Sequence, residues 1–119
     1  MSAKSVIMRG DVRWASLAEP AGSSPGYRRP VVVVSADSFN ASAINTVVVV
    51  AMSSNLDLER APGNVAVSGD RSGLRKDSVA NVSQILTLDK RHLDDRVTTL
   101  DDATMGQIES GLRLVLDLS

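Results

Sequence analysis

Two runs of valine constrain the fold of this chain more than any other feature. They read VVVV at residues 31–34 and TVVVVAM at residues 46–52. Short, continuous β-branched runs predict strands that are buried on both faces, because no polar residue alternates with the apolar ones. Two such strands need cover on both sides, so we expect a sheet that curls around its own core. With 119 residues, 43% of them hydrophobic, the chain is long enough for one globular domain spanning residues 1–119.

Three further segments have strand character: residues 11–17, 65–67 and 78–90. The last of them is interrupted near Ser83. Pro30 stands directly before the first valine run, and we place it at the first position of that strand, where proline is tolerated. Residues 18–28 and 54–64 predict long connections, and long connections in compact domains often carry function.

The strand predicted at residues 11–17 has a mixed composition. Val12, Trp14 and Leu17 predict one buried face, and Arg13 is expected on the opposite side. The preceding Arg-Gly-Asp triplet at residues 9–11 predicts a turn that leads into the strand.

The C-terminal segment changes from strand to helix. Its apolar residues recur at helical spacing: Met105, Ile108, Leu112, Val115 and Leu116. We therefore predict a helix near residues 101–117, with Thr99 and Asp102 spaced as in a capping box. Strands followed by one amphipathic helix favour a mainly β fold, a small curled antiparallel barrel of about five to seven strands closed by a C-terminal helix.

Composition excludes several classes of function. The chain has no cysteine and a single histidine, His92, so disulfides are impossible and a zinc site is not expected. No segment approaches the roughly 20 apolar residues of a membrane span, and the N-terminus lacks a secretory signal. We expect a cytoplasmic protein with no cofactor and no membrane contact. Net charge is −1, but residues 1–55 carry five basic and three acidic side chains, so a polyanion would bind near the first half.

Two adjacent arginines, Arg28 and Arg29, lie just before the first valine run. They could be gatekeepers that limit aggregation of an apolar strand. They could also form a site, because Ser53 ends the second valine strand and antiparallel pairing would bring Arg29 and Ser53 to one edge of the sheet. A guanidinium binds phosphate through a planar fork and stabilises developing negative charge. Such a pair suits metal-free cleavage of RNA, whose 2′-hydroxyl supplies the nucleophile.

Three segments together resemble the MazF/PemK/Kid toxin family. They are RGDVRWASLAEPAGSSPGYRRPVVVVSADSFN from Arg9, TVVVVAMSSN from Thr46, and SVANVSQILTLDKRHL from Ser78. The first contains the family's RG[DE] start, its GS…RRP loop and its valine strand. The second matches the apolar strand that ends in Thr or Ser, and the third matches a V…QI.T.DK..L segment. The resemblance covers roughly residues 9–118.

The resemblance implies an SH3-like barrel that forms homodimers and cleaves single-stranded RNA at short sequences, without metal or ribosome, until a cognate MazE-like antitoxin neutralises it. It assigns Arg29 and Ser53 as catalytic, with Ser53 standing where many members have threonine. The RNA-binding residues that it implies are Ser24, Tyr27, Arg28, Ser54, Asn55, Ser83 and Gln84. The acidic residue that often precedes the family's glutamine is replaced here by Ser83, which bears on the RNA sequence recognised.

Two alternatives remain open at the level of sequence. The same barrel occurs in CcdB-like toxins, which bind DNA gyrase and are not nucleases, and an inactive relative could serve as an interaction module. A gyrase-binding protein has no need for an arginine paired with a hydroxyl, so Arg29 and Ser53 favour the nuclease. The carboxylates at positions 89, 94, 95, 101 and 102 are expected to form a solvated face and a helix N-terminus.

Overall fold

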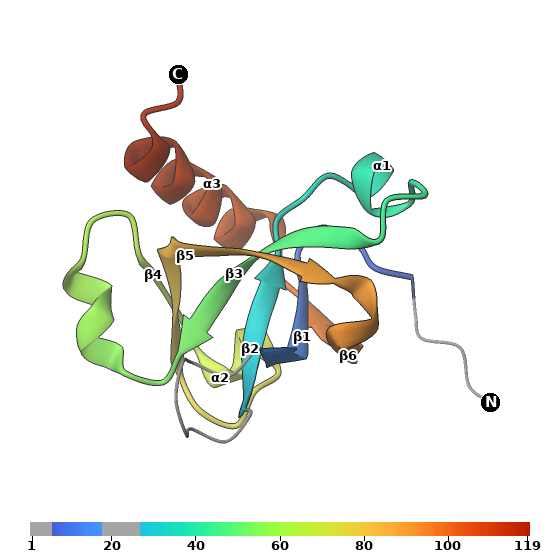
Figure 1. Ribbon diagram of the computed structural model, residues 1–119. Coiled ribbons are helices and arrows are strands. Elements are labelled where there is room, and N and C mark those ends of the chain that lie inside the picture. The colour runs from blue at the N-terminus through green and yellow to red at the C-terminus, as the bar shows by residue number, and fades with distance from the viewer. Residues whose placement is uncertain (1–5, 18–26) are drawn as a thin grey trace, which may run out of the picture.

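The computed structural model describes residues 6–17 and 27–119 (Figure 1). Its strands are β1 Asp11–Leu17, β2 Tyr27–Val33, β3 Thr46–Ser53, β4 Val65–Val67, β5 Ser78–Asp89 and β6 Leu93–Thr99. Its helices are α1 Asp37–Asn40, α2 Gly69–Ser72 and α3 Asp102–Leu116, with two 3-10 helices, η1 Leu56–Arg60 and η2 Lys90–His92. The predicted connection at 18–28 falls largely outside the described residues. Among these residues, no helix has the length and apolar character needed to cross a bilayer.

The six strands form one antiparallel sheet in the order β4-β5-β3-β2-β1-β6. The sheet curls, and α3 packs against β4 and β5 (Figure 1). The predicted mainly β fold with a C-terminal helix is therefore confirmed. The outer strands β4 and β6 are not paired with each other in the described part of the chain, so the sheet is a half-barrel rather than a closed barrel.

The valine strands supply core to both faces of the sheet, as their composition predicts. On the face toward α3, Val32 and Val50 pack with Ile108 and other apolar side chains. On the opposite face, Val31 and Val49 pack with a second apolar cluster. Alternate residues of one strand thus enter different halves of the core, because successive side chains of a strand point to opposite faces.

Pro30 does not begin β2 as expected, because it is the fourth residue of the strand and pairs with Trp14 of β1. Pairing of β2 with β3 begins only at Val31. Over its first four residues β2 therefore has a neighbour on one side only, and the missing N–H of proline removes no hydrogen bond to β3.

β5 is continuous through Ser83, where the sequence predicts a break, but its pairing is irregular. Val50 of β3 lies opposite Ile85, whereas Met52 lies opposite Ala80, so the four residues 81–84 of β5 correspond to the single residue Ala51 of β3. A bulge bends the strand and increases its twist. This bend lets one strand pair with β3 along most of its length and also with β4 at its start.

Arg13 is fully buried, contrary to the predicted exposed side of β1. Its guanidinium donates through Nε and Nη2 to Oδ2 of Asp11, at 3.2 and 3.0 Å, and Asp11 is buried as well. It also donates to the carbonyl oxygens of Val6 and Asp94. Asp11 in turn accepts from the Thr99 hydroxyl at 3.1 Å. This buried ion pair ties β1 to β6 and to the N-terminal segment.

Helix α3 begins as predicted, but with a different cap. Asp101 is the N-cap, and its carboxylate accepts from the backbone N–H of Thr104 at 2.8 Å. The proximity of Thr104 and its hydrogen bonding lower the pKa of Asp101 below its ordinary value of 3.8. The Thr99 hydroxyl donates to Asp11, so Thr99 does not form the capping box expected from the sequence.

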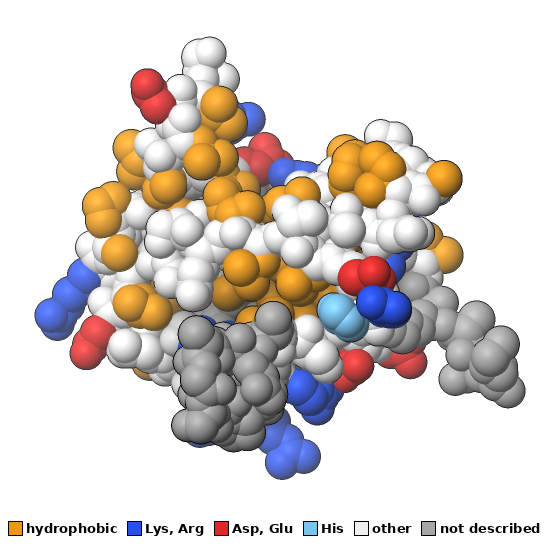
Figure 2. Space-filling view, in the orientation of Figure 1, with side chains coloured by type: hydrophobic (Ala, Val, Ile, Leu, Met, Phe, Trp, Pro, Cys, Tyr) orange, Lys and Arg blue, Asp and Glu red, His pale blue; other side chains and the backbone are white. Residues whose placement is uncertain are grey.

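The two glycines of α3 differ in their surroundings. Gly106 has open space where a Cβ would stand, whereas a Cβ on Gly111 would collide with the carbonyl oxygen of Gly63. Gly111 therefore lets the helix touch the loop before β4. Beyond Leu112, which packs against the core, the apolar side chains are exposed: Leu114, Val115, Leu116 and Leu118. Figure 2 shows hydrophobic side chains gathered over this end of α3.

Candidate functional site at the ends of two valine strands

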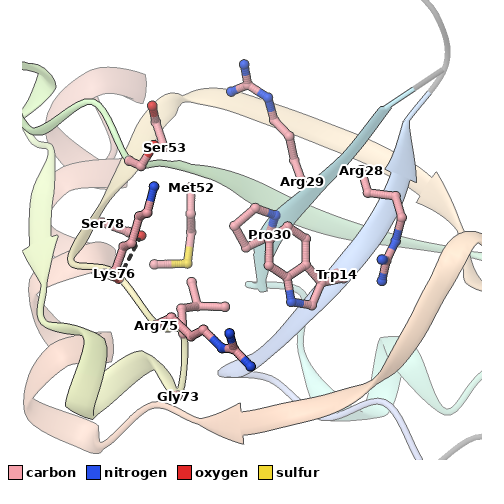
Figure 3. A pocket seen from close by; sticks show the side chains of 12 residues that line it. Trp14, Arg28, Arg29, Pro30, Met52, Ser53, Gly73, Arg75, Lys76 and Ser78 are labelled. Carbon is pink, nitrogen blue, oxygen red and sulfur yellow. Dashed lines mark hydrogen bonds between the residues drawn. The ribbon is translucent and has the colours of Figure 1, made fainter. Parts of the chain in front are cut away.

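Arg29 and Ser53 come together because of the register between β2 and β3. The last β2–β3 pair at this end of the sheet is Val31 opposite Ala51, and Arg29 and Ser53 each lie two residues beyond that pair. Both are an even number of residues from this pair, so they share one face of the sheet. Figure 3 shows the two side chains pointing to the same side. The structure therefore places this predicted pair at one end of the sheet.

A cleft of about 600 Å³ opens at these strand ends (Figure 3). Its walls come from β1, β2, the end of β3 and the segment after α2. The lining residues are Trp14, Arg28, Arg29, Pro30, Met52, Ser53, Ser54, Gly73, Leu74, Arg75, Lys76 and Ser78. Four of them are cationic and none is acidic, so the cleft is suited to a polyanion. Met52 is buried and forms its apolar floor.

The turn after β3 orients the hydroxyl group of Ser53. The backbone N–H of Asn55 donates to Oγ of Ser53 at 3.1 Å. Oγ is thereby used as an acceptor within the protein, and its own proton is suited to donate toward a bound oxyanion. The side chain of Asn55 caps η1 by accepting from Asp57 N–H. Asn55 therefore stabilises this turn, and the neighbouring Ser54 lines the cleft.

Arg28 points to the other face of β2, because it is adjacent to Arg29 in an extended strand. Its guanidinium lies over the indole of Trp14, 5.4 Å from the ring centroid, and pairs with the carboxylate of Asp94 on β6. An exposed ion pair of this kind contributes little to stability, but it fixes where the cation lies. The two arginines thus have different partners, and only Arg29 shares a face with Ser53.

Arg75 and Lys76 are site residues that the sequence analysis missed. They lie in the segment between α2 and β5, which returns to the cleft through Gly73 at φ +73°, a conformation that favours glycine. The carboxylate of Asp77 accepts from Gly69 N–H at 2.8 Å and holds the two ends of this segment together. The sequence feature that could have indicated them is the pair of basic residues in SGLRKD, residues 72–77. Composition alone does not show that this segment lies next to the valine strands.

The remaining predicted RNA-binding residues lie elsewhere. Ser83 and Gln84 are exposed on the bulge of β5 and do not line the cleft, and the Ser83 hydroxyl donates to Asn81 at 3.0 Å. Ser24 and the side chain of Tyr27 lie outside what the structure describes. Within residues 6–17 and 27–119, no group of three or more His, Asp or Glu side chains is placed to bind a metal ion.

Comparison with known proteins shows the same similarity along most of the chain. Residues 8–116 match the family described as the PemK-like, MazF-like toxin of type II toxin–antitoxin systems. Endoribonuclease MazF6 of Mycobacterium tuberculosis is 44% identical over 113 residues, which cover 95% of this chain and 99% of that protein. Endoribonuclease EndoA of Bacillus subtilis is 35% identical over 113 residues, covering 95% and 97%.

The fold is similar to that of a solved relative. An endoribonuclease from Mycobacterial species, in complex with its cognate antitoxin, aligns with a TM-score of 0.71 at 26% identity and covers 96% of each chain. The half-barrel with its C-terminal helix is therefore a fold in which toxin–antitoxin complexes have been observed.

Proposed function

The chain belongs to the PemK-like, MazF-like toxin family of type II toxin–antitoxin systems, and we propose that it is an endoribonuclease that cleaves single-stranded RNA at short sequences without a metal ion or a ribosome. The observation that carries the proposal is that Arg29 and Ser53, which share one face of the sheet, both line a cationic cleft. A gyrase-binding toxin has no use for this pair, and both relatives described above are endoribonucleases.

The chemistry follows from the groups in the cleft. The RNA 2′-oxygen attacks the adjacent phosphorus, so that the O2′–P bond forms and the P–O5′ bond breaks, with a proton lost from O2′ and one gained at O5′. The Arg29 guanidinium binds the non-bridging phosphate oxygens, where negative charge increases in the transition state. The Ser53 hydroxyl adds one oriented hydrogen bond. Arg75 and Lys76 bind neighbouring phosphates as less specific point contacts.

The assembly that supports this reaction is proposed to be a homodimer. One cleft of about 600 Å³ accommodates few nucleotides, and a second subunit would extend the surface along the strand. A twofold dimer is the commonest closed assembly of small proteins. Light scattering of the purified chain should give twice the monomer mass. A monomer at micromolar concentration with full cleavage activity would contradict the proposal.

A cognate, MazE-like antitoxin is the proposed partner that controls the activity in the cytoplasm. Four cations line the cleft, so an acidic, disordered antitoxin tail could occupy the place of RNA and become ordered on binding. Deleting that tail should abolish inhibition of cleavage. Inhibition that persists without the whole tail would rule out blocking of the cleft as the mechanism.

The experiment that tests the function is incubation of the purified chain with a long RNA in EDTA, followed by mapping of the cut ends. Discrete cuts that leave a 2′,3′-cyclic phosphate and a 5′-hydroxyl are expected. Arg29→Ala removes a preorganised donor and should lower the rate by about 10²–10³. Arg29→Lys should also lose most of the cleavage activity, because an ammonium group lacks the planar fork of a guanidinium. Ser53→Ala should lose activity by a similar factor, and Ser53→Thr should retain it.

The matched control is Arg60→Ala, which removes an exposed cation on η1 outside the cleft. It should leave cleavage unchanged. Every variant is first shown to be folded by circular dichroism. Cleavage at the wild-type rate by folded Arg29→Ala would make the arginines gatekeepers of the strand and overturn the site. Absence of cleavage by the wild-type chain would overturn the proposed activity itself.

A further inference from the structure

Trp14 has an unusual position for a large apolar residue. It is the only tryptophan in the chain, and it stands between the fully buried Arg13 and Ala15 of β1. Its own indole is only partly buried and lines the cationic cleft. An aromatic ring at the wall of a basic cleft matches the arrangement by which proteins bind single-stranded nucleic acid, with stacked bases and phosphates held by cations.

The orientation of the indole is fixed by a series of contacts that ends in the core. Arg28 lies over the ring, and the carboxylate of Asp94 pairs with Arg28. The backbone carbonyl of Asp94 accepts from the buried Arg13 at 2.9 Å. Arg13 itself is held by Asp11, which is equally buried. A ring held in this way binds a planar ligand with less loss of conformational entropy than a mobile one.

One surface of the indole is therefore occupied by Arg28, and the remainder contributes to the cleft wall. Across the cleft lies Arg75 (Figure 3), and Leu74 also lines the cleft. A planar base that enters between Trp14 and these two residues contacts apolar or delocalised groups. The phosphates that flank the base can then reach the cations that line the cleft. Every base has a π-face, so this contact contributes affinity without selecting one base strongly.

We propose that Trp14, held in place by Arg28 and Asp94, is a stacking platform for one nucleobase of the bound RNA. This inference rests on the proposed function, because it assigns a binding residue to the same site. Trp14 does not contact the reacting atoms in this assignment. It should therefore affect RNA affinity, whereas Arg29 and Ser53 should affect the chemical step.

The test combines cleavage with direct binding. An oligonucleotide with the mapped cleavage sequence and a 2′-O-methyl group at the nucleophile binds without being cut. Its affinity is measured by fluorescence anisotropy, and the single tryptophan reports stacking by quenching. Trp14→Leu should weaken binding roughly tenfold or more and raise KM with kcat within about threefold. Trp14→Phe should restore most of the affinity, since it keeps an aromatic face. Leu116→Ala, at the exposed end of α3, is the matched control and should bind normally.

An abasic scan separates stacking from a merely structural role. Replacing one nucleotide at a time by an abasic residue should reveal a single position where wild-type binding falls and Trp14→Leu binding does not. If Trp14→Leu binds every oligonucleotide as tightly as the wild type while cleavage remains normal, the platform is wrong and the proposed function stands. If the wild-type chain cuts no RNA but random 2′-O-methyl heptamers still quench Trp14, the activity is wrong and the platform stands. Absence of both cleavage and quenching overturns both.

Discussion

Replacement of Asp11 by alanine is expected to be the most destabilising simple change to a charged residue of this fold. Asp11 and Arg13 are both fully buried, and Oδ2 of Asp11 accepts two hydrogen bonds from the guanidinium and one from Met8 N–H at 2.9 Å. Asp11→Ala leaves Arg13 charged and buried without its counter-ion. Breaking a buried pair from one side costs about 3–5 kcal/mol.

The cost should be large relative to the whole stability of the domain. Domains of this size unfold with about 5–15 kcal/mol, and a loss of 1 kcal/mol lowers Tm by roughly 3–5 °C at this chain length. We therefore expect Asp11→Ala to lower Tm by about 10–20 °C. Urea unfolding followed by circular dichroism and by fluorescence of Trp14, which is adjacent to Arg13, gives the free energy of unfolding directly.

Two comparisons test the reasoning behind this number. Asp57→Ala removes an exposed carboxylate on η1 and should cost less than about 1 kcal/mol. The double variant Asp11→Leu with Arg13→Met replaces the pair by apolar side chains and should recover much of the loss, since the buried charge is gone. If Asp11→Ala costs no more than Asp57→Ala, the ion pair is not the buried tie between β1 and β6 that the structure indicates.

Three further predictions follow from other contacts. Asp94→Asn frees Arg28 from its carboxylate, so the slope of log K against log salt for RNA binding should steepen by about 0.7, as measured by titration at several salt concentrations. Gly106→Ala should stabilise α3 by about 0.5–1 kcal/mol, whereas Gly111→Ala should destabilise the protein because its Cβ meets backbone; urea unfolding of the two variants gives opposite signs. The lowered pKa of Asp101 means that its cap stabilises the protein above pH 3.8 and is lost as the pH falls through the folded pKa, so Tm measured against pH should show the difference from Asp101→Ala disappearing on acidification.

The central strands could be predicted because burial on both faces leaves an uninterrupted run of valines. β6 could not, since in LDDRVTT only Leu93 is buried and the remaining side chains carry no apolar period. Arg13 was misplaced for a related reason. Its burial depends on Asp11 and on carbonyl groups of Val6 and Asp94, and these partners are assembled only by the folded sheet.

The site likewise contains features that follow from local sequence and features that depend on distant contacts. That Arg29 and Ser53 line one cleft could be expected from the positions at which two consecutive strands start and end. Arg75 and Lys76 reach the cleft through α2 and a glycine turn, and the path of that segment cannot be read from composition. That Arg28 and Arg29 point to opposite faces follows from the alternation of side chains along a strand. The partner of Arg28, Asp94, lies 66 residues away in the sequence, so this contact could not be predicted.

Because Arg28 and Arg29 point to opposite faces of β2, insertions and deletions in this part of the strand are restricted. Side chains repeat every two residues along β2, so inserting or deleting one residue between Arg29 and Val31 would exchange the faces of the two arginines. The cation that shares a face with Ser53 would then turn toward Trp14, even though the composition of the strand was almost unchanged. Insertions upstream of Tyr27 alter only the connection and leave this parity intact. Homologues should therefore vary in length before the paired arginines and keep a fixed spacing from the second arginine to the valine run.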